Sequence, residues 1–145
     1  MSNEQNKTEQ IMFFIWAQSV VATLGSLFFS EIMGFIPCEL CWIQRILMYP
    51  LVIIYGTALV KKDWKIGLPG LFMSGIGLFV SAYHYLLQKW SFLSEVGDSC
   101  GVVSCNLEYI NYFGFITIPF LALVAFIVIF GLHITLLLQQ RRKKQ

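Results

Sequence analysis

Four apolar stretches, each long enough to cross a lipid bilayer, constrain the fold of this chain more than any other feature of its sequence. They run roughly from Ile11 to Met33, from Trp42 to Val60, from Ile66 to Gln88 and from Phe115 to Leu138. A helix needs about 20 residues to cross the hydrocarbon core. Over the whole chain 57% of the residues are apolar and only 12% are charged, so a polar surface cannot cover the protein. The sequence therefore predicts an all-α polytopic membrane protein, with a single four-helix transmembrane domain over residues 1–145.

Basic residues are concentrated on one side of this predicted bundle. Eight of the ten lysines and arginines lie before the first span, between the second and third spans, or after the fourth: Lys7, Lys61, Lys62, Lys65, Arg141, Arg142, Lys143 and Lys144. Because basic residues are enriched on the cytoplasmic side of membrane proteins, both termini are predicted to be cytoplasmic. The two outer loops are then residues 34–41 and 89–114. The net charge of +2 is too small to indicate a nucleic-acid partner.

All four cysteines fall in the two predicted outer loops, as Cys38, Cys41, Cys100 and Cys105. Outside the cytoplasmic membrane, thiols meet an oxidising compartment. In the segment PCELC, Cys38 and Cys41 stand three positions apart at a helix start, where they can close a small disulfide ring. The unpaired N–H groups of a first helical turn favour a thiolate over a thiol, and the thiolate is the species that attacks disulfides. The pattern therefore indicates redox catalysis.

Other kinds of site compete with redox catalysis for these cysteines. A c-type haem site requires a histidine directly after the second cysteine, where this chain has Trp42. A zinc site built from all four thiolates stays open, because both pairs are predicted on the same side of the membrane. Disulfides that only staple the outer loops also stay open, and four cysteines allow three pairings.

Arg45 lies inside the second predicted span, where a charged residue is energetically unfavourable and therefore indicates a function. The cost of inserting an arginine is about 2.5 to 3.5 kcal/mol at the centre of a span and less near the interface. Arg45 follows Cys41 by four residues, so it should lie on the same helix face one turn deeper. A cation there can stabilise a thiolate and negative charge on an electron acceptor. Gln44 adds a hydrogen-bond donor beside it, although Gln44 can equally serve helix packing and Arg45 can simply reach lipid headgroups.

The electron acceptor is expected to be a molecule dissolved in the membrane, because the sequence has no nucleotide-binding glycine loop and no haem motif. A lipid-soluble quinone, menaquinone or ubiquinone, accepts two electrons and two protons, which a dithiol supplies. His84 is predicted near the outer end of the third span, where it could donate to a quinone oxygen, although an interfacial histidine is the simpler interpretation. The candidate quinone-binding residues are therefore Arg45, Gln44 and His84, and no metal is expected. His133, in the fourth span, is expected to pack or hydrogen-bond with a neighbouring helix.

These features together resemble the bacterial disulfide bond formation protein B family, and within it the short Gram-positive type, disulfide formation protein C. The resemblance covers the whole chain: four spans, a CxxC motif opening the second span, an arginine four positions after its second cysteine, and another cysteine pair before the fourth span. It implies a quinone-dependent thiol oxidase of the bacterial cytoplasmic membrane, with its cysteines facing outside. The expected partner is a thioredoxin-like extracytoplasmic thiol-disulfide oxidase, which in turn puts disulfides into secreted proteins.

The resemblance also implies a role for each cysteine by position. Cys100 would form the mixed disulfide with the partner, Cys105 would pass electrons to Cys38, and Cys41 would lie against the quinone beside Arg45. This chain departs from the family pattern in one way that affects the transfer from Cys105 to Cys38. Only four residues separate the loop cysteines here, whereas relatives space them more widely. Such a tight ring has less reach toward Cys38.

Two other functions stay open. The first is a non-catalytic membrane subunit whose outer loops are only stapled by disulfides, which would have inert cysteines. The second is a quinone reductase similar to vitamin K epoxide reductase, which also combines four helices, quinone and two thiol pairs. In that enzyme class the CxxC motif follows the loop pair, whereas in this chain it comes first.

Overall fold

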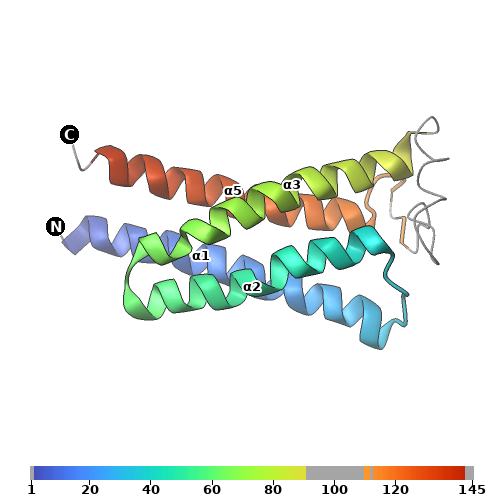
Figure 1. The fold of residues 1–145 in the computed structure, drawn as a ribbon, viewed down its shortest axis with the longest axis horizontal. Helices are drawn as coiled ribbons and strands as arrows, with labels where there is room; N and C mark the ends of the chain where they lie inside the picture. Colours follow the sequence, from blue (N-terminus) through green and yellow to red (C-terminus); the bar gives the residue numbers. More distant parts are fainter. Residues whose placement is uncertain (1, 91–109, 112, 143–145) are drawn as a thin grey trace.

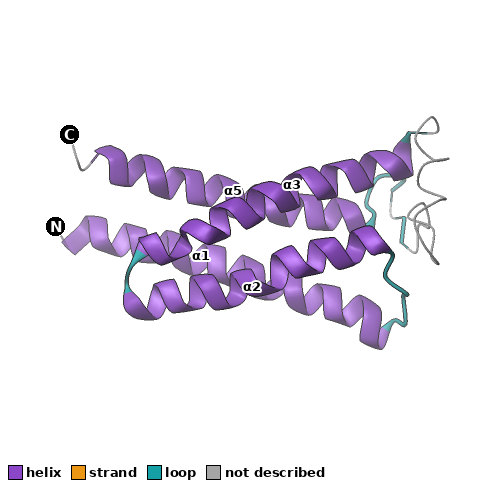
Figure 2. Cartoon of the chain, in the orientation of Figure 1, coloured by secondary structure: helices purple, strands orange, loops and turns teal. Residues whose placement is uncertain are grey.

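Four long helices form the part of the chain that the computed structural model describes, which is residues 2–90, 110–111 and 113–142. The helices are α1 (Ser2–Leu27), α2 (Glu39–Lys61), α3 (Leu68–Lys89) and α5 (Ile118–Arg142). A short π-helix, η1 (Phe28–Ile32), extends α1, and a 3-10 turn, η2 (Trp64–Gly67), precedes α3. The helices run up and down in one bundle, and the two ends of the chain lie at the same end of it (Figure 1). Figure 2 shows only helices and loops among these described residues.

Four helical segments are long and apolar enough to cross a membrane: Gln5–Ile32, Glu39–Lys61, Trp64–Lys89 and Ile118–Arg142. Many large apolar side chains point away from the bundle, as at Val60 and Phe79, which are 85% and 77% exposed. In water such a surface would be strongly unfavourable, whereas lipid chains can cover it. The predicted all-α, four-helix membrane bundle is therefore confirmed. The cytoplasmic location of its termini stays a prediction.

Two prolines start helices in this fold instead of interrupting them. Pro69 and Pro119 are the second residues of α3 and α5. At these positions the missing N–H costs no intrahelical hydrogen bond, and the fixed φ angle suits the first turn. Pro50, by contrast, lies inside α2. The start of α2, at Glu39, lies three residues before the Trp42 at which the apolar pattern begins, so the helix start is immediately next to Cys38.

The core of the bundle is held together by aromatic side chains that pack against glycines of α3. Tyr55 of α2 and Phe126 of α5 are fully buried. A Cβ atom added at Gly70 would lie 2.7 Å from the Tyr55 ring, and one at Gly77 would overlap the Phe126 ring. Small residues let helices approach closely in lipid. Gly70, Gly77 and His84 follow one another at intervals of seven residues and are all buried, so the glycine-packed face of α3 also carries His84 into the interior.

A second buried histidine links two helices in the half of the bundle that contains the termini. Nδ1 of His133 on α5 lies 2.6 Å from the hydroxyl oxygen of Tyr55 on α2. Both side chains are at most 1% exposed. The expectation that His133 hydrogen-bonds a neighbouring helix is therefore confirmed.

Replacing Gly77 with alanine is expected to lower the free energy of unfolding in detergent by about 1 to 3 kcal/mol, because the new methyl group would overpack the buried Phe126 ring. The measurement is the thermal unfolding midpoint of the purified protein. Gly131→Ala on α5 is the matched control, since a Cβ atom there meets nothing within 4 Å. Alanine favours a helix over glycine, so the control should be neutral or slightly more stable. Equal midpoints for the two variants would contradict close packing at Gly77.

Candidate active site

Two cysteines lie together where α2 begins. Cys38 is the residue before the first helical turn, with extended backbone angles of φ −73° and ψ 174°, and its carbonyl accepts a hydrogen bond from the Trp42 N–H. Cys38 is buried and Cys41 is half-buried. The two residues are thiols, and their Sγ atoms lie 3.0 Å apart. Because a disulfide bond is about 2.05 Å long, the sulfurs need only a small movement to be joined.

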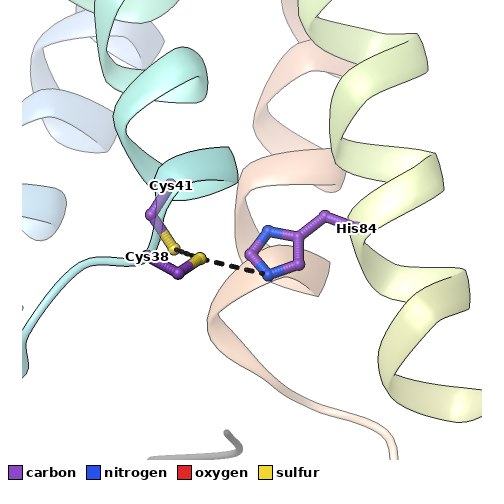
Figure 3. Close-up of side chains that lie close together, drawn as sticks. All are labelled: Cys38, Cys41 and His84. Carbon is purple, nitrogen blue, oxygen red and sulfur yellow. Dashed lines mark hydrogen bonds between the residues drawn. The ribbon is translucent and has the colours of Figure 1, made fainter. Parts of the chain in front are cut away.

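His84 reaches the cysteine pair from the neighbouring helix α3. Its Nε2 atom lies 3.7 Å from Cys38 Sγ, and its Nδ1 atom lies 3.2 Å from Nε2 of Gln44. Figure 3 shows the two sulfurs at the start of α2 and the imidazole pointing toward them. His84 is only 1% exposed, so it lies inside the bundle and not at its interface with solvent.

The two thiols of the reduced pair have different surroundings, since Cys38 is buried and Cys41 is half-buried. The hydrogen bond from Cys38 to Cys41, and then burial, raise the pKa of the Cys38 thiol to about 12, although the hydrogen bond with His84 acts in the opposite direction. Cys38 therefore keeps its proton at neutral pH while Cys41 is also reduced. The thiolate that a helix start favours is accordingly not at Cys38 in this state.

A cavity of about 350 Å³ opens beside the cysteine pair. It lies between α1, α2, the end of α3 and the start of α5, and Cys38, Cys41, Gln44, Arg45 and His84 all contribute to its wall. The rest of the wall is mostly apolar and includes Phe29, Ile36, Met48, Leu121 and Ala122. An apolar cavity with a few convergent polar groups is the usual form of a small-molecule site.

Arg45 lies at this cavity and also joins two helices. Its Nη2 donates a hydrogen bond to the Ser26 carbonyl oxygen near the end of α1, at 3.2 Å. Its guanidinium carbon lies 5.5 Å from the centre of the Trp42 ring, which is within the range of a cation–π contact. A guanidinium has five N–H groups, so one carbonyl partner leaves it able to donate to a ligand oxygen as well.

Thr117 is a cavity residue that the sequence did not reveal. It precedes the first turn of α5 and is 1% exposed, and its Oγ1 atom has no hydrogen-bond partner among the described residues. A buried hydroxyl without a partner costs free energy, so an oxygen-bearing ligand in the cavity would be favoured there. A threonine shortly before a proline at the start of a span carries no functional signal of its own.

Five of the seven site residues expected from the sequence thus lie around one cavity. They are Cys38, Cys41, Gln44, Arg45 and His84. The other two, Cys100 and Cys105, lie outside the described residues, and their expected roles stay predictions. Metal-ligand atoms of Cys38, Cys41 and His84 also lie close to one another.

Comparisons with known proteins give a consistent result. The family model for "Disulfide bond formation protein DsbB" matches residues 8–136. A "Probable disulfide formation protein" of Oceanobacillus iheyensis is 59% identical over 144 residues, which cover 99% of each chain. The "Disulfide bond formation protein C" of Bacillus subtilis is 53% identical over 118 residues, which cover 81% of this chain and 86% of that protein. No solved structure matches this chain significantly.

Proposed function

This chain belongs to the disulfide bond formation protein DsbB family, and on that basis we propose that it passes electrons from a reduced, thioredoxin-like extracytoplasmic oxidase to membrane quinone. Members of this family are multi-pass membrane oxidoreductases that act in disulfide bond formation. The single observation that carries the finer proposal is the Cys38 and Cys41 pair in the wall of an apolar cavity that Arg45 also lines. In this function the chain keeps the partner oxidised, and the partner forms disulfides in secreted proteins.

The cavity fits a flat, largely apolar molecule with oxygen atoms at its edge. Its volume of about 350 Å³ lies in the range of small-molecule sites. Apolar residues supply most of the wall, while Arg45 and the Thr117 hydroxyl supply hydrogen-bond donors for ligand oxygens. A quinone bound there would supply a two-electron, two-proton acceptor for the reduced cysteine pair.

The cysteines would act by thiol–disulfide exchange, in which each step breaks one S–S bond and forms another. Attack of the reduced partner on the Cys100–Cys105 disulfide gives a mixed disulfide with Cys100 and, after release of the oxidised partner, two loop thiols. Attack of Cys105 on Cys38 then breaks the Cys38–Cys41 disulfide and releases Cys41 as a thiolate. Attack of Cys100 on Cys105 restores the loop disulfide. The pair at α2 is left as a dithiol that carries two electrons and two protons.

Three residues around the cysteine pair would stabilise the charge that develops there and exchange its protons. The Arg45 guanidinium, one turn from Cys41 on α2, stabilises negative charge that develops on a sulfur or on a ligand oxygen. The His84 imidazole can accept or donate a proton at Nε2, the atom that faces Cys38 Sγ. Gln44 fixes the orientation of the ring through Nδ1.

We place the cysteine end of the bundle outside the cytoplasmic membrane. The described basic residues at the other end, which also holds the two ends of the chain, are Lys7, Lys61, Lys62, Lys65, Arg141 and Arg142. Such a concentration of positive charge is typical of a cytoplasmic face. The cysteine pair would then meet the oxidising side, where a secreted partner can reach it.

The test is turnover in detergent, with reduced thioredoxin-like oxidase as electron donor and quinone absorbance as the measured quantity. A Cys100→Ser/Cys105→Ser double variant should lose turnover with the protein donor, because no disulfide is left to accept its electrons. The same variant should still reduce quinone when a small dithiol is the donor, since that molecule can reduce the Cys38–Cys41 disulfide directly. A double variant that turns over at the wild-type rate with the protein donor would contradict the proposed division of roles. Cysteines that stay inert toward both donors would instead indicate a non-catalytic subunit.

A further inference from the structure

Three side chains in the wall of the cavity bring metal-ligand atoms close together. Cys38 Sγ, Cys41 Sγ and one ring nitrogen of His84 all lie within 4.8 Å of one another. Two of the side chains come from the start of α2 and the third from α3, and all three converge in Figure 3. From the sequence no metal was expected, and a zinc site of four thiolates was only left open, whereas the described residues offer two sulfurs and a histidine nitrogen.

The spacing of these atoms is close to that of a tetrahedral zinc site. With bonds of about 2.3 Å to sulfur and about 2.0 Å to nitrogen, a tetrahedral ion holds two sulfurs about 3.8 Å apart and a sulfur and a nitrogen about 3.5 Å apart. Here the two sulfurs are 3.0 Å apart, and Cys38 Sγ is 3.7 Å from His84 Nε2. Small side-chain movements therefore suffice to reach the required geometry.

The charge of such a site also suits its surroundings. Two thiolates and a neutral imidazole around a divalent cation give no net charge, and a neutral complex costs far less than an isolated ion in an apolar environment. Sulfur and imidazole ligands select ions such as Zn²⁺ and exclude Mg²⁺ and Ca²⁺, which prefer oxygen.

We propose that the reduced Cys38 and Cys41 pair, together with Nε2 of His84, forms a binding site for Zn²⁺ or a similar thiophilic divalent cation, with the fourth position open to the cavity. Binding replaces the two thiol protons, which pass to solvent. The site exists only in the reduced state, because the sulfurs of a disulfide are not thiolates. Where the proposed quinone function holds, the bound ion occupies both sulfurs and blocks turnover.

Gln44 sets which nitrogen of His84 is available to a metal. In the structure its Nε2 lies 3.2 Å from His84 Nδ1, an arrangement in which the amide donates and the ring proton is on Nε2. Metal binding at Nε2 requires the proton on Nδ1, so the amide turns over and its oxygen accepts that proton. A carboxylate at this position would favour the metal-binding tautomer without any rearrangement.

The test uses Cd²⁺ as a spectroscopic probe on the full-length chain in detergent. In the Cys100→Ser/Cys105→Ser background only Cys38 and Cys41 remain as thiols, so any thiolate-to-metal charge-transfer band belongs to them. The reduced protein should show this band at one ion per chain, and Zn²⁺ should compete for the site. The same protein with its Cys38–Cys41 disulfide closed should show no band, and this comparison requires no further substitution.

The histidine is tested by the affinity for Zn²⁺ in the same competition. His84→Gln should weaken binding at least about tenfold, whereas Gln44→Glu should tighten it by stabilising the imidazole tautomer. His133→Gln is the matched control, because His133 pairs with Tyr55, which lies 11 residues beyond Gln44 on α2. That separation is about 16 Å along the helix axis.

Either of two results would overturn the proposal. One is the absence of the charge-transfer band when one Cd²⁺ per chain is added to the reduced protein, which would show that the two thiolates do not bind the ion. The other is an affinity for Zn²⁺ that His84→Gln leaves unchanged, which would exclude the histidine as a ligand. Neither measurement uses quinone or the protein partner, so failure of the metal site is distinguishable from failure of the proposed function.

Discussion

Cys41→Ser is expected to abolish quinone reduction, with a rate at least about 1,000-fold below that of the unaltered chain, as is typical when a covalently acting group is removed. Serine has nearly the same shape as cysteine, but its hydroxyl cannot form a disulfide with Cys38. Without that disulfide the described residues offer no two-electron carrier next to the cavity. The Cys41 sulfur lies 3.0 Å from Cys38 Sγ and lines the cavity, so no other described thiol can take its place. The measurement is quinone absorbance during turnover with the reduced partner.

The control for this variant separates chemistry from binding. An equilibrium titration of Cys41→Ser with quinone should give nearly the affinity of the unaltered chain, because Arg45 and the apolar wall of the cavity remain. Cys38→Ser should lose activity to the same extent, since one sulfur alone cannot form the disulfide. A Cys41→Ser protein that turned over normally would leave the cysteines with only a stapling role.

The bundle itself could be predicted because the properties that determine it are local. The length and apolar character of each stretch are sufficient to indicate a membrane-spanning helix. The relation between Cys41 and Arg45 was predictable for the same reason, since residues four apart on one helix share a face. Both residues do line the same cavity. The first prediction required only the length and apolar character of one stretch, and the second only the periodicity of one helix.

The contact between Cys38 and His84 could not be predicted in this way, because it joins residues 46 positions apart on different helices. It depends on how α3 is rotated about its own axis. That rotation is fixed where Gly70 packs on Tyr55 and Gly77 packs on Phe126, and such partners are known only from the structure. The interval of seven residues from Gly70 to Gly77 to His84 was a usable signal, since it places the histidine on the face with the smallest side chains.

The hydrogen-bond partner of Arg45 could not be predicted from the sequence either. The guanidinium donates to a backbone carbonyl, that of Ser26, and every residue carries such a group. The sequence therefore left two interpretations open: a catalytic arginine, or one that only reaches lipid headgroups. In the structure Arg45 is half-buried, tied to α1 and placed at the cavity. Its position permits a hydrogen bond to a ligand oxygen in the cavity.

Arg45→Met is expected to raise the KM for quinone by about 10- to 100-fold. A hydrogen bond from a charged group contributes roughly 1.5 to 3 kcal/mol, and each 1.4 kcal/mol corresponds to a factor of ten in affinity. Methionine keeps an apolar side chain of similar length, so the cavity wall is filled while the donor is lost. The measurement is the initial rate of quinone reduction over a range of quinone concentrations, with the partner held in excess.

Two further variants decide what the arginine contributes. Arg45→Lys keeps a positive charge but loses the planar set of donors, so its KM should fall between those of the other two proteins. Lys89→Met is the matched control, because Lys89 is a cation at the same end of the bundle that is not part of the cavity wall. A higher KM with unchanged kcat would mean that Arg45 holds the ligand equally before and during the reaction, whereas a lower kcat would mean that it stabilises charge formed in the transition state. Unchanged values of both constants in Arg45→Met would leave Arg45 with a structural role only, through its contacts with Ser26 and Trp42.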